Sequence, residues 1–431
     1  MTGLNEGDFM QLIKEKKTFQ LNFIILFFSL SFFSGIFTYM SYFLDNEYLK
    51  IWKEIYIILI YIVAFDFKLK KIDVNSIIIS LFIGSFFFIE IIYSWLLEIP
   101  ASIILYQLKN DLLLVLFFIC IYNLFLKINY EDIMIFSKKI IKIMIFLGVI
   151  NAIAMIFEFI FFEQFLNLIG LDMGNWGTAA GVKIITSGSY LRPIGLQSGF
   201  VQASNLVLIS FIVMNENKIY NIKNKKIKYI INLIFFIAIM LSTYATAIIG
   251  FILYVIMKLI NKKFKLNLFF ILSIILFLFF LYTTHGLGVY EFIYTIYPDK
   301  ADTSILFRIE GHWDIINDLS KNIISFLLGT GLGVNGIVGL DKELYGIISI
   351  ATDSAYIYLF SNYGIIGVVA YVFILIYYMI KFNKNDILGI ESCLFYILIV
   401  DFFFNNTVIT FPINFFIVLL INLALRLRRI S

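Results

Sequence analysis

Long apolar runs separated by short basic segments dominate the chain from residue 20 to residue 425. A helix needs about 20 mostly apolar residues to cross the hydrocarbon core of a bilayer. The segments near that length are 20–43, 54–67, 76–97, 111–127, 140–162, 196–215, 228–242, 245–260, 267–284, 364–381, 387–404 and 409–425. The pattern therefore predicts an all-α polytopic membrane protein, a single integral membrane domain over residues 1–431 with about twelve transmembrane helices.

Composition supports this class of protein. Hydrophobic residues make up 61% of the 431 residues, whereas soluble domains are about 45–50% apolar, so the excess must face lipid. Cys120 and Cys393 both lie in apolar runs, and no Cys/His spacing fits a zinc site. No basic patch of the kind that binds nucleic acid is present. We therefore expect no structural disulfide, no metal or other cofactor, and no nucleic-acid partner.

Basic residues cluster at alternate ends of the predicted helices. The clusters that fall on one side are 14–17, 68–71, 138–142, 223–228, 262–265, 381–384 and 426–429. The positive-inside rule predicts that this side is cytoplasmic, together with both termini, and we expect a multi-pass protein of the cytoplasmic (inner) membrane. Two long loops, 163–195 and 285–363, then lie on the extracytoplasmic side, where long loops are usually functional.

Arginine is scarce, with five residues against 28 lysines. Three arginines stand at the C-terminal end, and Arg192 and Arg308 lie one in each long outer loop. The rigid fork of donors on arginine matches phosphate oxygens two at a time. We expect Arg192 and Arg308 to converge on a diphosphate group. The alternative is that each makes an ordinary surface ion pair, such as Arg308 with Glu310.

The residues around these arginines predict their positions. Pro193 and Gly195 interrupt helical structure just before the predicted helix at 196–215, which places Arg192 at the outer membrane–water interface. Gln197 either faces a cavity and binds substrate or hydrogen-bonds to neighbouring helices. After Arg308, residues alternate at helical spacing and predict an amphipathic helix on the membrane surface. Its apolar face is Trp313, Ile316, Leu319 or Ser320, and Ile323, and its polar face is Asp314, Asp318 and Lys321. His312 is a candidate site residue beside Arg308.

Further candidates lie toward the C-terminal end of the second loop. Residues 328–336 form a Gly-rich turn in which the amides of Gly331 and Gly333 either cradle an anion or belong to a re-entrant turn. Asp353 precedes a helical run, so it either caps that helix or acts as a general base. Glu90 and Asp401 are costly inside lipid and must face a cavity or a partner, which favours a transport path.

Residues 190–380 resemble the O-antigen polymerase and ligase superfamily of the Wzy/WaaL type. The matching pieces, in order, are residues 192–195, 242–250, 308–313, 328–333 and 353–356, with Gly364 and Gly367. The resemblance implies a membrane glycosyltransferase that uses glycans carried on undecaprenyl diphosphate at the outer face of the cytoplasmic membrane. It also implies a flippase and a chain-length regulator as partners. Ligases usually carry a His-Asn type motif where this chain has Asp353-Ser354, which favours a polymerase.

These inferences give one hypothesis and three alternatives. In the hypothesis, Arg192 and Arg308 bind the diphosphate of the donor, and Asp353 or else His312 accepts the proton of the acceptor hydroxyl. The first alternative is a ligase that passes finished polymer to lipid A-core. The second is a transporter of lipid-linked oligosaccharides, which charged residues inside the membrane would favour. The third is a non-catalytic scaffold in a polysaccharide assembly complex.

Overall fold

The computed structural model describes residues 6–64, 74–168, 178–179, 182–183, 186–187, 190–259, 304–335, 352, 354–383, 386–401 and 405–428. Helices account for most of these residues, which confirms the prediction of an all-helical architecture. The helices are also strongly apolar, as expected for a membrane protein.

The first half of the chain is a run of helices joined by short turns. The elements are α1 (Glu6–Ser31), α2 (Ser34–Phe43), the 3-10 helix η1 (Glu47–Ile51), α3 (Trp52–Ala64), α4 (Val74–Leu96), α5 (Ala101–Leu126), α6 (Tyr130–Ile160) and α7 (Phe162–Leu168). The first predicted outer loop, 163–195, therefore contains most of α7. It also contains two small antiparallel pairs, β1 (Thr178–Ala179) with β2 (Val182–Lys183) and β3 (Thr186–Ser187) with β4 (Tyr190–Leu191).

The second half continues with helices. They are α8 (Phe200–Glu216), α9 (Lys225–Leu241), α10 (Ala245–Leu259), α13 (Ser304–Ser320), α14 (Ile323–Leu328), α15 (Ala355–Asn383), α16 (Ile390–Val400) and α17 (Ile413–Arg428). Within the second predicted outer loop, 285–363, the structure describes α13, α14 and the first turns of α15. The predicted span 267–284 lies outside the described residues.

Several helices are able to cross a bilayer. Within the described residues, three are long and apolar enough to span alone, namely α5, α6 and α15. The α1–α2 pair, bent by 67°, would make a fourth span. Shorter apolar helices cover Ile83–Leu96, Phe200–Glu216 and Ala245–Ile256. The total of about twelve spans and the orientation of the chain stay predictions.

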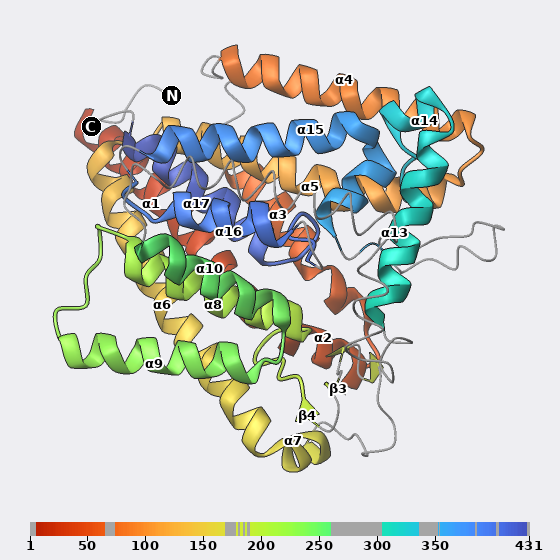
Figure 1. Ribbon diagram of the computed structural model, residues 1–431. Helices are drawn as coiled ribbons and strands as arrows, with labels where there is room; N and C mark the ends of the chain where they lie inside the picture. Colours follow the sequence, from red (N-terminus) through yellow and green to blue (C-terminus); the bar gives the residue numbers. More distant parts are fainter. Residues whose placement is uncertain are drawn as a thin grey trace.

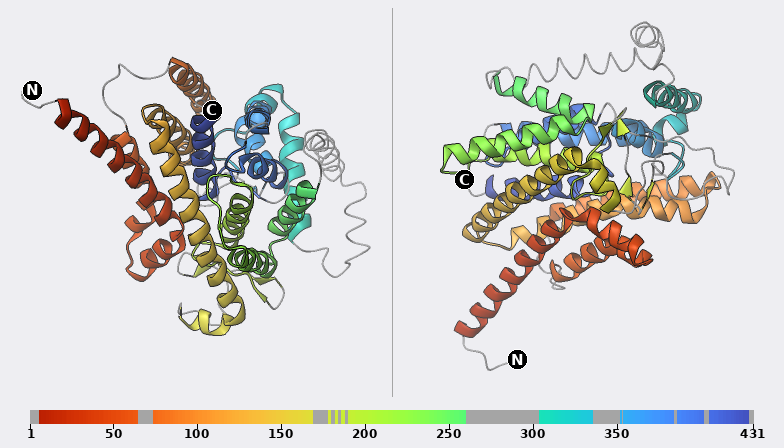
Figure 2. Two further views of the ribbon diagram at one scale, coloured as in Figure 1. Left: turned by 90° about the vertical axis from the view of Figure 1, so that its left-hand side faces the viewer. Right: turned by 90° about the horizontal axis from the view of Figure 1, so that it is seen from below.

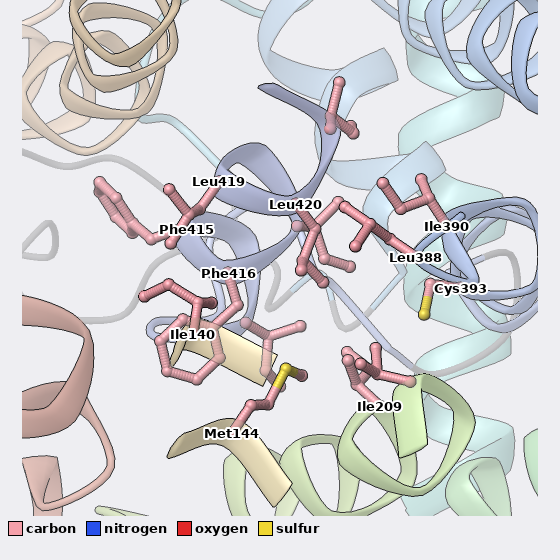
Figure 3. Close-up of a cluster of buried hydrophobic side chains, with 14 of the residues drawn as sticks. Ile140, Met144, Ile209, Leu388, Ile390, Cys393, Phe415, Phe416, Leu419 and Leu420 are labelled. Carbon is pink, nitrogen blue, oxygen red and sulfur yellow. The ribbon is translucent and has the colours of Figure 1, made fainter. Parts of the chain in front are cut away.

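A large apolar core joins helices that are distant in sequence. Figure 3 shows Met144 of α6, Ile209 of α8, Cys393 of α16 and Phe416 of α17 converging in it. Large apolar side chains also cover the outside of the bundle, for example Trp95 at 73% and Phe373 at 67% exposure. An outer surface of this kind is stable in lipid, because hydrocarbon solvates apolar side chains and cannot satisfy polar backbone groups.

The helix predicted after Arg308 is present in the structure as part of α13. It crosses one end of the bundle. Figure 1 shows α13 lying across the ends of the other helices, and the right-hand view of Figure 2 shows it nearly end-on beside lengthwise helices. The start of α1, the 217–224 connection and the end of α17 lie toward the opposite end of the bundle. We call the two ends the α13 end and the basic end, because the latter carries Lys218, Lys225, Lys381 and Arg426.

Candidate functional site

The segment that carries Arg192 is fixed to the end of α6 near the α13 end. Its backbone amides donate three hydrogen bonds: Ile194 and Gly195 to Glu158 Oε2 at 2.8 Å each, and Leu196 to Asn151 Oδ1 at 2.8 Å. Glu158 and Asn151 are buried, at 7% and 0% exposure. Three buried or partly buried hydrogen bonds to side chains of one helix hold the segment in place, because breaking any of them would leave a polar group without a partner. The segment is therefore rigid rather than an open loop.

Arg192 itself stacks on an aromatic ring at the start of α8. Its guanidinium carbon lies 4.9 Å from the centre of the Phe200 ring, and the residue is half-buried. Cation–π attraction to the ring favours this position of the guanidinium. Phe200 in turn packs edge-on against Tyr244, with ring centres 5.4 Å apart.

Tyr244 lies at a strained break between α9 and α10. Thr243 has φ +50°, which is an outlier for a β-branched residue. The turn is closed by Ser242, whose hydroxyl accepts a hydrogen bond from the Tyr244 amide at 3.3 Å. The Tyr244 side chain is buried, and its hydroxyl donates to Asn405 Oδ1 at 3.3 Å. The break therefore directs a tyrosine hydroxyl into the interior of the bundle.

Asp401, just past α16, is the centre of a buried hydrogen-bond network. Its carboxylate accepts from Tyr371 Oη at 2.5 Å, from the Thr407 amide at 3.0 Å and from Asn405 Nδ2 at 3.1 Å. The Thr407 hydroxyl donates to it as well. Asp401 is fully buried, and a carboxylate is stable in such a place only when donors satisfy its oxygens. Four donors do so here.

The backbone of the same segment holds the chain just before α15. The Ala355 amide donates to the carbonyl oxygens of Asp401 at 3.0 Å and Asn405 at 3.1 Å. The Ser354 hydroxyl donates to the Asp401 carbonyl at 3.0 Å. Thr352 and Ser354 are both buried, and Asp353, the candidate base between them, lies outside the described residues.

A third link comes from α8. Asn205 donates from Nδ2 to Asn405 Oδ1 at 3.0 Å and accepts from the Tyr396 hydroxyl. We call the set the Asp401 network; its members are Asn205, Tyr244, Ser354, Tyr371, Tyr396, Asp401, Asn405 and Thr407. Contacts thus run continuously from Arg192 through Phe200, Tyr244, Asn405 and Asp401 to Ser354.

The helix α13 reaches the same end of α15. Ile315 and Leu319 of α13 pack in one buried cluster with Ile357 and Phe360 from the first turns of α15. His312, one turn earlier in α13, is buried at 4% exposure. Arg308 lies one further turn back, and its side chain is outside the described residues. That the guanidinium groups of Arg192 and Arg308 share a pocket therefore stays a prediction.

The face that α13 buries agrees in part with the predicted one. The sequence predicted an apolar face through Trp313, Ile316, Leu319 or Ser320, and Ile323. Leu319 is buried and Ile316 is partly buried in the same cluster, whereas His312 and Ile315 are buried as well and Ile323 is 75% exposed. Ile323 departs from the prediction because α13 ends at Ser320 and Ile323 begins the separate helix α14, so the helical register is not continuous between them.

The Gly-rich turn is packed against protein. The Thr330 amide donates to the Ser361 carbonyl at 2.7 Å, the Leu332 amide to Ser94 Oγ at 2.8 Å, and the Gly333 amide to Asn362 Oδ1 at 2.8 Å. A Cβ on Gly331 would overlap Ile99, and one on Gly333 would overlap Ile103. These contacts support the re-entrant turn and give no support to anion binding by Gly331 and Gly333.

The side chain of Gln197 also makes its hydrogen bonds within the protein. Its Nε2 donates to the Phe32 carbonyl at 2.5 Å, and its Oε1 accepts from the Ser34 hydroxyl at 2.8 Å. Both partners flank the bend between α1 and α2. Gln197 therefore stabilises that bend, and the helix-contact interpretation of this residue holds over the substrate-binding one.

Two carboxylates were missed as site or anchor residues, Glu158, which is buried, and Asp111, which is partly buried. Glu158 anchors the Arg192 segment, as described above. Asp111 of α5 accepts from Tyr358 Oη at 2.8 Å, from Gln107 Nε2 at 2.6 Å and from the Tyr363 hydroxyl. The available signal was an acidic residue within or beside an apolar run, which is expensive in lipid and therefore needs an interior partner.

The long apolar helices indicate a membrane protein, and carboxyl groups inside its helix bundle organise polar contacts. Comparison with protein-family models, with curated proteins and with solved structures finds no match to this chain.

Proposed function

We propose that this protein is a membrane glycosyltransferase that polymerises a surface polysaccharide, joining undecaprenyl-diphosphate-linked repeat units at the outer face of the cytoplasmic membrane. The observation that carries the proposal is the Asp401 network. It joins the segments at 242–250 and 353–356, and the ring contacts of Phe200 with Tyr244 and Arg192 extend it to 192–195. These are three of the pieces on which the resemblance to O-antigen polymerases rests.

The placement of charge supports an outward-facing site. The basic end carries Lys218, Lys225, Lys381 and Arg426, whereas Arg192 and α13 lie toward the other end. Under the positive-inside rule the basic end faces the cytoplasm and the α13 end faces outward. A lipid diphosphate in the outer leaflet would project at this level.

In the proposed reaction, Arg192 binds the diphosphate of the donor with the guanidinium that lies over Phe200, and Arg308 supplies the second cation. The acceptor hydroxyl oxygen attacks the anomeric carbon of the donor glycan, and the bond from that carbon to the diphosphate oxygen breaks. The electron pair leaves on undecaprenyl diphosphate, whose added negative charge the arginines stabilise. Asp353, or else His312, takes the hydroxyl proton.

The glycan profile of cells that lack the protein tests the function. Accumulation of single lipid-linked repeat units supports the polymerase, whereas accumulation of full-length lipid-linked polymer indicates the ligase. Arg192→Lys and Arg308→Lys keep the charge and lose the fork, so both should shorten the polysaccharide ladder. Normal ladders at normal protein levels from Arg192→Ala and Arg308→Ala would remove the proposed roles.

One observation favours a carrier as the second candidate. Glu90 of α4 is fully buried, and neither of its carboxylate oxygens has a hydrogen-bond partner among the described residues. Such a group inside a bundle is typical of ion or substrate paths. Flux of a lipid-linked oligosaccharide into proteoliposomes that Glu90→Gln abolishes would favour transport over polymerisation.

A further inference from the structure

A groove opens on the outside of the bundle between α9 and α10, with α8 as its floor. Its volume is about 340 Å³, within the range of roughly 300–1,000 Å³ typical of ligand sites. Apolar side chains form most of its walls, namely Phe211, Leu233, Phe236, Phe251 and Val255. We call it the α9–α10 groove. A hydrocarbon chain of a surrounding lipid fits such a lining better than water does.

One end of the groove is lined by residues from the start of α9 and the end of α10, which lie toward the basic end. Tyr229, one turn into α9, and Leu259, the last residue of α10, stand at this opening with 71% and 82% exposure. Lys258 lines the same end, and half of its side chain is exposed. The first turn of α9 adds Lys225, Lys226 and Lys228.

The charge at this opening is positive. Lys258 Nζ lies 3.3 Å from Glu216 Oε1, which also accepts from Tyr254 Oη at 2.7 Å. Glu216 therefore offsets one cation, and the three lysines of α9 have no acidic neighbour within the first turn of that helix. The opening thus attracts a negatively charged headgroup at the membrane surface.

A polar pair lies inside the apolar groove. Asn215 Nδ2 donates to Asn232 Oδ1 at 2.8 Å and to the Phe211 carbonyl at 3.0 Å. The Asn232 side chain therefore uses its oxygen within the protein and retains its Nδ2 donors for an acceptor in the groove. An ester carbonyl of a glycerolipid is an acceptor of this kind.

We propose that the α9–α10 groove binds one anionic phospholipid of the basic-end leaflet. One acyl chain lies along Leu233, Phe236 and Val255, an ester carbonyl accepts from Asn232, and the phosphate sits between Lys258 and the lysines of α9. Charge complementarity at the opening selects an anionic lipid over a zwitterionic one. The apolar lining selects a lipid over free phosphate. This site is separate from the Asp401 network and does not depend on the proposed function.

The test uses the purified full-length protein in detergent, with retention of added lipid measured by native mass spectrometry. Wild-type protein should retain one phosphatidylglycerol more tightly than phosphatidylcholine, and free phosphate should not compete. Lys225→Gln combined with Lys226→Gln changes only exposed residues. Affinity for phosphatidylglycerol should fall by about 25-fold if each near-surface lysine contributes about fivefold.

Two further variants separate the groove from general charge. Val255→Trp fills the apolar wall at a partly exposed position and should abolish specific retention of phosphatidylglycerol with the lysines intact. Lys139→Gln removes an exposed lysine of α6 outside the groove and should leave retention unchanged. Equal retention of phosphatidylglycerol and phosphatidylcholine, or undiminished retention by Val255→Trp, would overturn the proposal and indicate only unspecific boundary lipid.

Discussion

Replacing Asp401 with leucine removes the acceptor for four donors at once. The donors are the Tyr371 hydroxyl, the Thr407 amide, the Thr407 hydroxyl and Asn405 Nδ2. Each buried donor left without a partner costs about 1–3 kcal/mol. The two hydroxyl groups are able to rotate toward other acceptors, whereas the Thr407 amide and Asn405 Nδ2 are fixed. After allowance for no longer burying a carboxylate, we expect Asp401→Leu to destabilise the fold by roughly 3 kcal/mol.

Asp401→Asn keeps the shape and one acceptor oxygen, so its cost should be smaller, about 1–2 kcal/mol. The matched control is Asp318→Asn on α13, where the carboxylate is 68% exposed and pairs with Lys321 at 2.6 Å. An exposed pair of this kind contributes about 0–1 kcal/mol. Equilibrium unfolding in mixed micelles gives the free energy of unfolding of each variant.

A double-mutant cycle with Tyr371→Phe isolates the contact of Asp401 with Tyr371. Inter-helix hydrogen bonds in membrane proteins average about 0.6 kcal/mol, with a maximum near 1.7, so the coupling should lie in the upper part of that range for this charge-assisted bond. An Asp401→Leu protein as stable as wild type, or a coupling of zero, would refute the account of Asp401 as the centre of the network.

Three other substitutions follow from the same structure. Glu158→Ala leaves two buried amides of the Arg192 segment without an acceptor, so the free energy of unfolding should fall by about 2 kcal/mol or more and polymer length should fall with it, as ladder gels would report. Gly364→Ala places a Cβ on a residue with φ +58° and against the backbone of Leu327, so the thermal stability of the protein should drop clearly. The control is Gly84→Ala, whose added Cβ meets nothing within 4 Å, so this variant should be neutral or slightly stabilising. Asp386→Ala removes the acceptor for four amides at the start of α16, and unfolding measurements should register a loss of about 1–2 kcal/mol; an unchanged value would mean that water replaces the cap.

The helices were largely predictable from the sequence. An apolar segment in lipid has to satisfy its backbone groups within itself, and a helix is the local way to do so. The predicted segments 228–242 and 245–260 correspond closely to α9 and α10, including the break at Ser242–Thr243. The amphipathic spacing after Arg308 likewise gave a helix, because the pattern of one turn is a local property.

The extent of a helix beyond its apolar run was decided by tertiary contacts. The predicted span 111–127 begins at residue 101 in the structure, as α5. The added turns contain Gln107, and the span opens with Asp111, polar residues that shorten an apolar window. Gln107 is buried and Asp111 is partly buried, because Tyr358 and Tyr363 of α15 supply their partners. Such partners are invisible to any local pattern.

In the candidate site, too, some features follow from local sequence patterns and others only from tertiary contacts. Sequence alone singled out Arg192, its break before a helix, and the segment around Asp353, because rare residue types and chain breakers are local signals. Only the folded bundle places Asn205 and Tyr244 on Asn405, across 200 and 161 residues of chain. A polar side chain in an apolar helix indicates that a hydrogen-bond partner for it lies inside the bundle. Which partner it meets depends on how distant helices pack, and that choice belongs to the tertiary structure.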